Sequence, residues 1–596
     1  MKKTYLTDKT IAVLPFKNIS YNIENEYFSE GITEEIINAL SKIEQLKVIS
    51  RTSSFYFKNK EFTLKQIAGQ LNADIIIEGS VRIVDENVRI MAQLIQSEDD
   101  FHFWSETWDR KLENILQIQD EISILIADKL REHLGHFDIK EHLVENKTVH
   151  PDAYNYYLKA RYYFNKWNPD DVEKAIGFFN KAIEIDPDFT DAYVGMADAY
   201  SFMATTQFMP PAKAWKKTVE YTHKAYSLNA ENAGVHYLLA NLSFFTNCDF
   251  ADAYQHILKS LELKPGYPEA QQYMAFLYML AGEKEKAHHH LQLALGIDPL
   301  NKETLFYRAY YYYRSKEFKK AMAMFEELLK DNPKNLPALM VYSYCMLLLK
   351  QYDELLPKIE NIPEEILIPH EQLGILCLIY ILKGDKKNAV RYLKKLETEA
   401  KKPAAFQAHS YLFLSYANLG KFDEAFDLLE QSLKMKSSVL LISYSDPLVN
   451  GLVKDKRYNH YHKKLYGHIK PPKPGIKKKP LLDPETARKF ADKILNFVET
   501  EKPYLNPTIS LRDLANQVEI HPNQLSWLLN EAIGKKFNEF INHYRVEHFK
   551  ELAKNPENAH ISIIGLAYES GFNSKTVFNT FFKKEMGITP QEFLKS

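Results

Sequence analysis

The chain of 596 residues is poor in cysteine, with only Cys248, Cys345 and Cys377, which are far apart in the sequence. An odd number of widely spaced cysteines argues against a disulfide framework, and no spacing typical of a metal site occurs. The sequence also lacks a phosphate-binding loop, a nucleophile elbow and a metal-binding constellation. We therefore expect a protein of a reducing compartment that is not an enzyme and has no catalytic residues, metal or cofactor.

Long hydrophobic segments are missing as well. The longest nearly apolar runs, such as Leu373–Leu382, are about half the length that a bilayer-spanning helix requires. The first ten residues, MKKTYLTDKT, contain two early lysines but no apolar core, so we expect no signal peptide. We expect a cytoplasmic protein without membrane contacts.

The chain has no excess of charge of either sign. It contains 76 lysine and arginine residues against 78 acidic residues, a net charge of −2, and its pI is about 6.9. Residues 481–596 contain 14 basic and 15 acidic residues. A strongly basic nucleic-acid-binding domain is therefore excluded, and any attraction to phosphate must come from local lysine clusters, with a modest salt dependence. These clusters are Lys535–Lys536, Lys583–Lys584 and the lysines of 470–480.

The C-terminal segment has the pattern of two short helices joined by a turn. Ile563, Leu566 and Ala567 are spaced as on one face of a helix. Gly571 follows where the chain needs a positive φ, and Ser574 can cap the next helix. The second helix would turn its phenylalanines inward and expose Lys575, Thr576, Asn579 and Thr580. This arrangement is typical of a helix-turn-helix, whose second helix enters the DNA major groove.

A second copy of the pattern lies upstream. Leu511, Leu514 and Val518 form an apolar stripe, and Pro522 suits the first position of the next helix. That helix is expected to expose Asn523, Ser526, Trp527 and Asn530. A long amphipathic helix over 537–553 would connect the two copies.

Residues 507–594 resemble the DNA-binding domain of the AraC/XylS family of bacterial transcription regulators. The resemblance rests on Ile563, Leu566, Ala567, Gly571, Phe572, Ser574, Phe578, Phe582, Lys583, Lys584, Gly587, Thr589, Pro590 and Phe593, and upstream on Gly534, Phe537, Phe540, Tyr544 and Arg545. It implies that DNA bases are contacted by Asn523, Ser526, Trp527, Lys575, Thr576 and Thr580. We expect Asn530, Asn579 and Lys583, on the same helices, to contact DNA as well. The family often has arginine where Trp527 stands, so this side chain either stacks on a sugar or thymine methyl group or serves packing.

The N-terminal region alternates strands with helices, which predicts a small α/β domain. The expected strands are 10–16, 47–50 and 74–79, followed by a hairpin of 80–84 and 88–95; the expected helices are 25–41, 64–71 and 113–134. The region resembles the TolB-like amino-terminal domain that often precedes tetratricopeptide repeats. The matching segments are 11–16, 27–35, 48–53, 78–81 and 104–110. Glu34, Glu35, Glu78, Arg51 and Arg110 are catalytic candidates by residue type alone, and salt-bridging or capping roles are the alternative.

A repeat begins at Pro151. Pro265, Pro299 and Pro333 are 34 residues apart, the period of tetratricopeptide repeats. We count about eight copies, which predict an α-solenoid that binds a protein or peptide partner. Five tyrosines (Tyr307, Tyr310, Tyr311, Tyr312 and Tyr313) point in several directions, so most must pack, and a binding surface is the alternative. His288–His290 is expected to be a solvated helix face.

The sequence thus predicts a multidomain protein: an α/β domain (1–138), an α-solenoid (151–465), a linker rich in proline and lysine (466–480) and an all-α DNA-binding domain with two helix-turn-helix units (481–596). The function it favours is a transcription regulator whose repeat-containing region controls the C-terminal domain. The expected partners are double-stranded promoter DNA, a protein or peptide on the solenoid, and RNA polymerase as a further candidate. The alternatives are a repeat scaffold whose terminal domains contact proteins, and an enzyme with its site in the N-terminal domain.

Overall fold

The computed structural model describes residues 9–594 except 23–24, 44, 112–114, 145–147, 149, 167–168, 206–208, 334, 363–368, 403–404, 450 and 468–480. The predicted linker therefore lies almost entirely outside the described residues. The chain divides into two compact units. The first consists of Met1–Val48, Asn59–Asn146 and Lys473–Ser596; the second consists of Ile49–Lys58 and Lys147–Pro472.

The first unit contains a six-stranded mixed sheet. Its strands are β1 (Thr10–Val13), β2 (Lys17–Asn18), β3 (Lys47–Val48), β4 (Ile75–Val84), β5 (Asn87–Gln96) and β6 (Phe101–Lys111). The order is β3-β1-β4-β5-β6, and β2 pairs with β4. Strand β1 is parallel to both of its neighbours, β3 and β4, whereas β4, β5 and β6 form an antiparallel meander. Short, fully buried β-branched runs such as Ile75–Ile77 explain why the strands form here.

Strand β6 was not predicted. Its residues are mostly exposed or partly exposed, because the strand lies at the edge of the sheet and only Trp108 is buried. The expected separate strands 74–79 and 80–84 are one continuous strand, β4. The expected strand 47–50 is shorter, since Ser50 instead caps helix α2 (Arg51–Phe55).

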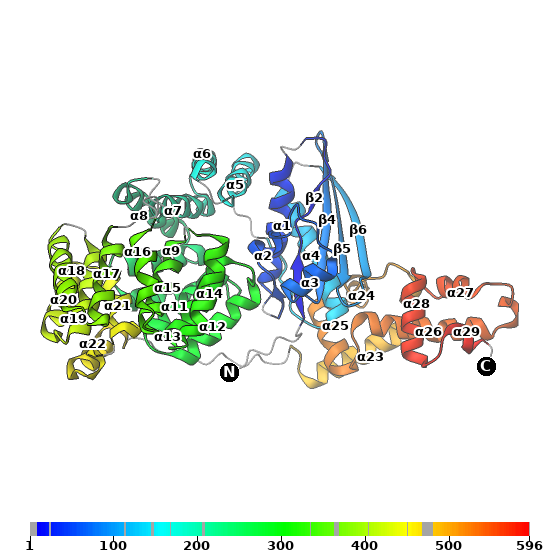
Figure 1. Cartoon of the computed structure of the whole chain (residues 1–596). Helices are drawn as coiled ribbons and strands as arrows, with labels where there is room; N and C mark the ends of the chain where they lie inside the picture. Colours follow the sequence, from blue (N-terminus) through cyan, green and yellow to red (C-terminus); the bar gives the residue numbers. More distant parts are fainter. Residues whose placement is uncertain are drawn as a thin grey trace. The chain divides into compact units, whose positions relative to one another are not determined.

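Three helices accompany the sheet: α1 (Glu26–Ser41), α3 (Leu64–Leu71) and α4 (Ile115–Leu134) (Figure 1). α1 packs against α4 and against β1, β2 and β3. Ile32, Ile36 and Leu40 of α1 and Ile126 and Leu130 of α4 are completely buried, so the contact is apolar.

The C-terminal part of the first unit is helical (Figure 1). Its elements are α23 (Pro484–Glu501), the short turn η6 (Pro503–Leu505), α24 (Leu511–Gln517), α25 (Pro522–Trp527), the π-helical turn η7 (Leu528–Ile533), α26 (Phe537–Lys554), η8 (Pro556–Asn558), α27 (Ile563–Glu569), α28 (Lys575–Met586) and α29 (Pro590–Phe593). Both predicted helix pairs and the long helix between them are present.

The second unit is a helical solenoid. The helices are α5 (Pro151–Phe164), α6 (Pro169–Ile185), α7 (Thr190–Thr205), α8 (Pro211–Leu228), α9 (Ala233–Phe245), α10 (Phe250–Leu263), α11 (Pro268–Leu280), α12 (Lys284–Ile297), α13 (Lys302–Arg314), α14 (Phe318–Asp331), α15 (Leu336–Leu348), α16 (Tyr352–Glu360), α17 (Pro369–Lys383), α18 (Lys386–Glu399), α19 (Phe406–Leu419) and α20 (Phe422–Lys434). Successive helices pack against each other, as in tetratricopeptide repeats. α21 (Val439–Tyr444), η4 (Pro447–Val449), η5 (Leu452–Lys454) and α22 (Lys456–Tyr466) follow.

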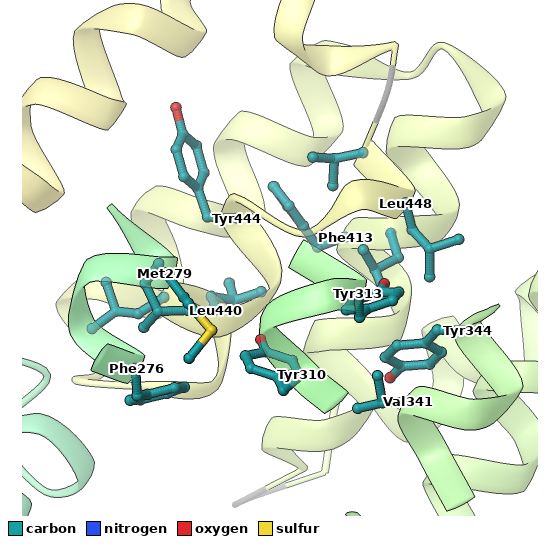
Figure 2. Packing of buried hydrophobic residues seen from close by; sticks show 14 of the residues in the cluster. Phe276, Met279, Tyr310, Tyr313, Val341, Tyr344, Phe413, Leu440, Tyr444 and Leu448 are labelled. Atoms are coloured by element: carbon teal, nitrogen blue, oxygen red, sulfur yellow. The ribbon is translucent and has the colours of Figure 1, made fainter. Parts of the chain in front are cut away.

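Two of the five clustered tyrosines belong to the solenoid core. Tyr310 and Tyr313 are buried among apolar side chains, whereas Tyr307, Tyr311 and Tyr312 are partly buried (Figure 2). The Tyr313 hydroxyl donates a hydrogen bond of 2.7 Å to Asp446. The hydroxyl is buried, so its polar atom needs a partner, and Asp446 provides it.

Residues 49–58 belong to the solenoid unit although they lie between strands of the sheet in sequence. The Ser53 hydroxyl donates to Asp298 Oδ1 at 2.6 Å, the Ser50 hydroxyl donates to the same oxygen, and Ser50 N–H donates to Ile297 O at 2.8 Å. Burial raises the pKa of Asp298, and the two serine hydroxyls oppose that shift. In the described part of the chain, no helix is long and apolar enough to cross a membrane.

Candidate nucleic-acid interface

The second helix pair, α27 and α28, has the local signals expected from the sequence. Ser562 and Ser574 cap the two helices through their hydroxyls. Gly571, in the turn, has a φ of +94°, which side chains other than glycine's rarely tolerate. The outer face of α28 is exposed to solvent, and its predicted residues are Lys575, Thr576, Asn579, Thr580 and Lys583.

The inner face of α28 is held by an aromatic cluster. Phe578 and Phe582 are completely buried, and the Phe578 ring lies 4.8 Å from Phe549 of α26 and 5.1 Å from Phe572 of the turn, measured between centroids. Rings at these distances and tilts pack favourably. The cluster therefore fixes the direction in which the exposed side chains of α28 point.

A buried arginine connects the turn to the rest of the C-terminal helices. Arg545 of α26 donates to the backbone oxygens of Tyr504 and Asn506, both at 2.8 Å. Burial lowers its pKa to about 10. A Cβ atom at Gly571 would lie 2.2 Å from Tyr504 O and 3.1 Å from Arg545 Nε. Glycine is therefore required here both by the backbone conformation and by the space available.

The first helix pair, α24 and α25, is also capped, although no caps were predicted there from the sequence. Ser510 and Asp513 form a capping box at α24, and His521 Nδ1 accepts from Asn523 N–H at 3.2 Å at α25. The expected exposure of α25 is wrong at one position: Ser526 is 1% exposed. Asn523, Trp527 and Asn530 are only partly exposed.

The face of α25 is covered by the N-terminal part of the same unit. The Asn523 carboxamide accepts hydrogen bonds from Arg131 Nη1 of α4 (2.5 Å) and from Ile139 N–H (3.2 Å), and it donates to Ile139 O at 3.1 Å. Gly135 also approaches Asn530, since a Cβ atom on Gly135 would lie 3.0 Å from Asn530 Oδ1. These contacts explain why Asn523 and Asn530 are only partly exposed.

Two carboxylates of α4 bind the beginning of α24. Glu132 accepts a hydrogen bond of 2.7 Å from Leu511 N–H, and Asp128 accepts from Arg512 at 3.0 Å. Asp128 also accepts from Arg131 at 2.6 Å. Burial raises the pKa of Glu132, while Lys129 and the Leu511 N–H oppose that shift. The contact is therefore polar and charge-assisted.

The basic groups of the second helix pair differ in their availability. Among the described residues, no carboxylate oxygen lies within 4.0 Å of the ammonium groups of Lys575 or Lys583. Lys584, in contrast, is bound to Glu539 at 2.8 Å. The predicted Lys583–Lys584 cluster therefore offers one unpaired ammonium group. Trp527 packs against the core formed by α23, α24 and α26, and its predicted contact with DNA stays a prediction.

Three of the catalytic candidates of the N-terminal region have separate partners. Arg110 is bound to Glu121, and Glu78 accepts from Gln93. Arg51 belongs to the solenoid unit, where its guanidinium lies 3.9 Å from the Phe55 ring. In the described ranges, no group of three or more histidine, cysteine or acidic side chains could hold a metal ion.

Two segments match known families. Residues 514–596 match a family described as a helix-turn-helix domain, and residues 7–125 match the family described as "HilA/YgeH-like transcriptional regulator, second domain". The chain is thus similar to a helix-turn-helix domain at its C-terminus and to a HilA-like regulator domain in its N-terminal region, with helical repeats between the two matched segments. The resemblance of the N-terminal region to a TolB-like domain stays a prediction.

Curated relatives cover different parts of the chain. It is 36% identical over 200 residues to a Rhizobium meliloti protein named "Putative adenylate cyclase 3", covering 34% of this chain and 33% of that protein. It is 22% identical over 295 residues to the transcriptional regulator HilA of Salmonella typhimurium (47% and 49% covered). It is 41% identical over 64 residues to the TCP pilus virulence regulatory protein of Vibrio cholerae (11% and 22% covered). The chain spans half or less of each of these three relatives.

Solved structures similar to the chain include a tetratricopeptide repeat protein from Parabacteroides merdae, with 14% identity, a TM-score of 0.31, and 45% of this chain and 99% of that one covered. Yeast Tom70 is similar with 14% identity and a TM-score of 0.28, covering 74% of this chain and 88% of that one.

Sequence patterns did not identify the residues of α4 that contact α24 and α25. Asp128, Arg131 and Glu132 are consecutive or i,i+3 charges in an amphipathic helix, a pattern that usually marks a solvated face. What distinguishes Arg131 is visible only in the structure, where its side chain is fully buried. A buried arginine requires partners, and these cannot be identified from the neighbouring sequence.

Proposed function

We propose that this protein is a sequence-specific DNA-binding transcription regulator, in which α24–α25 and α27–α28 are two helix-turn-helix units. The observation that carries the proposal is the outer face of α28. Five predicted DNA-contacting side chains are exposed there, and its lysines Lys575 and Lys583 lack a carboxylate within ion-pair distance among the described residues. A helix with such a face, fixed from behind by buried phenylalanines, is suited to enter the major groove.

The connecting helix supports binding at two sites. α26 has 18 residues, a length of roughly 27 Å at 1.5 Å per residue. Successive major-groove turns on one side of a duplex are about 34 Å apart. We propose that α25 and α28, the two recognition helices, enter successive turns. In this proposal the base contacts come from Asn523, Trp527, Lys575, Thr576 and Thr580, while Asn530 and Asn579 lie at the DNA and Lys583 contacts a phosphate. Ser526 is buried and is not proposed as a contact.

In this proposal the N-terminal region and the solenoid regulate DNA binding and do not catalyse a reaction. In our proposal the solenoid binds a protein or peptide partner, the protein acts in the cytoplasm on promoter DNA, and RNA polymerase is a further partner. We propose that it is not an enzyme. Two of the polar candidates of the N-terminal region support this, because Arg110 is bound to Glu121 and Glu78 accepts from Gln93, in two separate pairs. The name of the Rhizobium meliloti relative gives the contrary hypothesis, a cyclase. Assaying the full-length protein for conversion of ATP to cyclic AMP tests it, and turnover above that of a heat-inactivated sample would contradict our proposal.

Selection of bound sites from random double-stranded DNA tests the function with the full-length protein. We expect enrichment of one sequence, and loss of that enrichment in the combined Lys575→Ala, Thr576→Ala variant. A matched control changes Lys550→Ala and Thr500→Ala, which lie outside both recognition helices. If the wild-type protein enriches no sequence, the scaffold alternative replaces the regulator.

A further inference from the structure

The recognition helix α25 has a partner within its own unit at the positions proposed to contact bases. We infer that α4 and residues 135–139 form a docking surface for α25, and that this surface and DNA compete for Asn523. The inference rests on the proposed function and adds to it how access to the first recognition helix is controlled.

The first argument is the hydrogen-bond pattern at Asn523. Its carboxamide oxygen accepts from Ile139 N–H, and its amide nitrogen donates to Ile139 O, at 3.2 and 3.1 Å. Asparagine recognises adenine in the major groove with the same two groups, accepting from the N6 amino group and donating to N7. The backbone of Ile139 thus presents the donor and acceptor that an adenine edge would present. One carboxamide cannot make both pairs at once.

The second argument is the charge on the docking surface. Asp128 binds the guanidinium of Arg512, and Glu132 binds the backbone N–H of Leu511. Both acceptors are carboxylates, so the docking surface offers negative charge to the first residues of α24. Release of this surface would free the Arg512 guanidinium for a phosphate group.

The third argument is that the contact is reversible. The bonds named between the two parts are polar or charge-assisted, and water can replace each of them on separation. Arg131 has a fully buried side chain, and its Nε lacks a hydrogen-bond partner among the described residues, which weakens the docked state. A docked state that leaves a buried donor unsatisfied is suited to open when DNA offers Asn523 other hydrogen-bond partners.

Docking leaves the second recognition helix available. The outer face of α28 remains exposed, so the docked protein would contact DNA through α28 alone. Because only the undocked fraction can use both helices, docking raises the apparent dissociation constant by the reciprocal of that fraction. Release of α25 from the docking surface should therefore strengthen DNA binding and lengthen the DNA segment that the protein protects.

The test compares full-length variants on the selected site by equilibrium binding and footprinting. Arg131→Met keeps an apolar stem and removes the donors; its matched control is Arg89→Met, on the exposed face of β5. A second variant, Asp128→Asn, leaves the buried arginine unchanged, and its matched control is Asp109→Asn. We expect Arg131→Met and Asp128→Asn to tighten binding about tenfold or more and to extend the footprint by one half-site, with both controls unchanged.

Hydrogen exchange of the wild-type protein provides a measurement without mutation. The Ile139 amide, bonded to Asn523 in the docked state, should lose its protection when saturating DNA is added. If the Ile139 amide stays protected in a complex whose footprint covers both half-sites, the proposed competition between the docking surface and DNA is wrong. It is also wrong if wild type and both variants have identical affinities and footprints. No sequence preference in any variant, with Ile139 still protected, instead overturns the proposed function, and the inference with it.

Discussion

The guanidinium of Arg131 donates a hydrogen bond of 2.5 Å to the carboxamide of Asn523, although the two residues are 392 positions apart in sequence. One partner belongs to α4 of the N-terminal region and the other to the first proposed recognition helix. The bond shows that the first compact unit is assembled from both ends of the chain. A residue proposed to contact DNA is thus already engaged within the protein.

The first prediction separates base recognition from phosphate binding on α28. Lys575→Ala or Thr576→Ala should weaken binding to the selected site by about tenfold to a hundredfold and relax preference at one or two base pairs. Lys583→Ala should weaken binding to the selected site and to random DNA equally, and should lower the slope of log K against log salt concentration by about one. Titrations at several salt concentrations distinguish these outcomes. Equal losses on both DNAs for all three variants would place Lys575 and Thr576 on phosphates.

The second prediction concerns Gly571. Alanine there would adopt a positive φ and also place its Cβ 2.2 Å from Tyr504 O, so we expect a loss of about 1–3 kcal/mol in stability and displacement of α28. Gly587→Ala is the matched control, because Gly587 has a φ of +74° but no atom within 4 Å of its Cβ position. Footprinting should show that Gly571→Ala shortens the protected site at the α28 half while Gly587→Ala preserves it. An unchanged full-length footprint for Gly571→Ala would show that α28 does not contact DNA as proposed.

The third prediction is a pH dependence at His133 of α4. The His133 ring stacks on the Phe103 ring, with 4.0 Å between the ring centroids. Its pKa is lowered from 6.5 to about 4, first by burial and then by Lys536 and Lys9, with Glu539 opposing. The folded state therefore holds His133 neutral down to about pH 4, whereas the unfolded chain protonates it near 6.5. Between these values the unfolded state binds more protons, so acidification lowers stability, by on the order of 1–2 kcal/mol at pH 5.

His133→Gln removes this titration and should lose less stability than wild type when the pH falls from 7 to 5. Chemical denaturation at both pH values measures the difference. His142→Gln is the control, because His142 is exposed and its pKa is raised, first by its hydrogen bond to Asp120. If wild type and His133→Gln respond equally to acid, His133 is not held neutral in the folded protein.

The fourth prediction concerns the solenoid core. Tyr313→Phe removes the hydroxyl that donates to the buried Asp446. Leaving a buried carboxylate with one donor fewer should cost about 1–3 kcal/mol. Tyr311→Phe changes a partly buried neighbour and should be nearly neutral. Thermal unfolding followed by circular dichroism compares the two, and equal melting temperatures would mean that Asp446 finds another donor.

The features that the sequence predicted correctly depend on interactions between residues that are close together in the chain. The cap at Ser574, the positive φ of Gly571 and the 34-residue period all follow from interactions within a few turns of the chain. Strand β6 was missed because an edge strand with both faces partly solvated shows little hydrophobic alternation. The engagement of Asn523 could not be predicted, since its partner Arg131 is 392 positions away in the sequence.

The pairing of Ser50 and Ser53 with Asp298 bears on how the chain can be divided for expression. The polypeptide passes between the two compact units at 48/49, 58/59, 146/147 and 472/473, so no single cut separates them. A solenoid produced from residue 147 onward would lack both serine hydroxyls, and the Asp298 carboxylate would lose two of its donors. An exchange of repeat regions between such proteins would have to carry residues 49–58 as a separate insert, and the sheet would then need a new connection from β3 to α3.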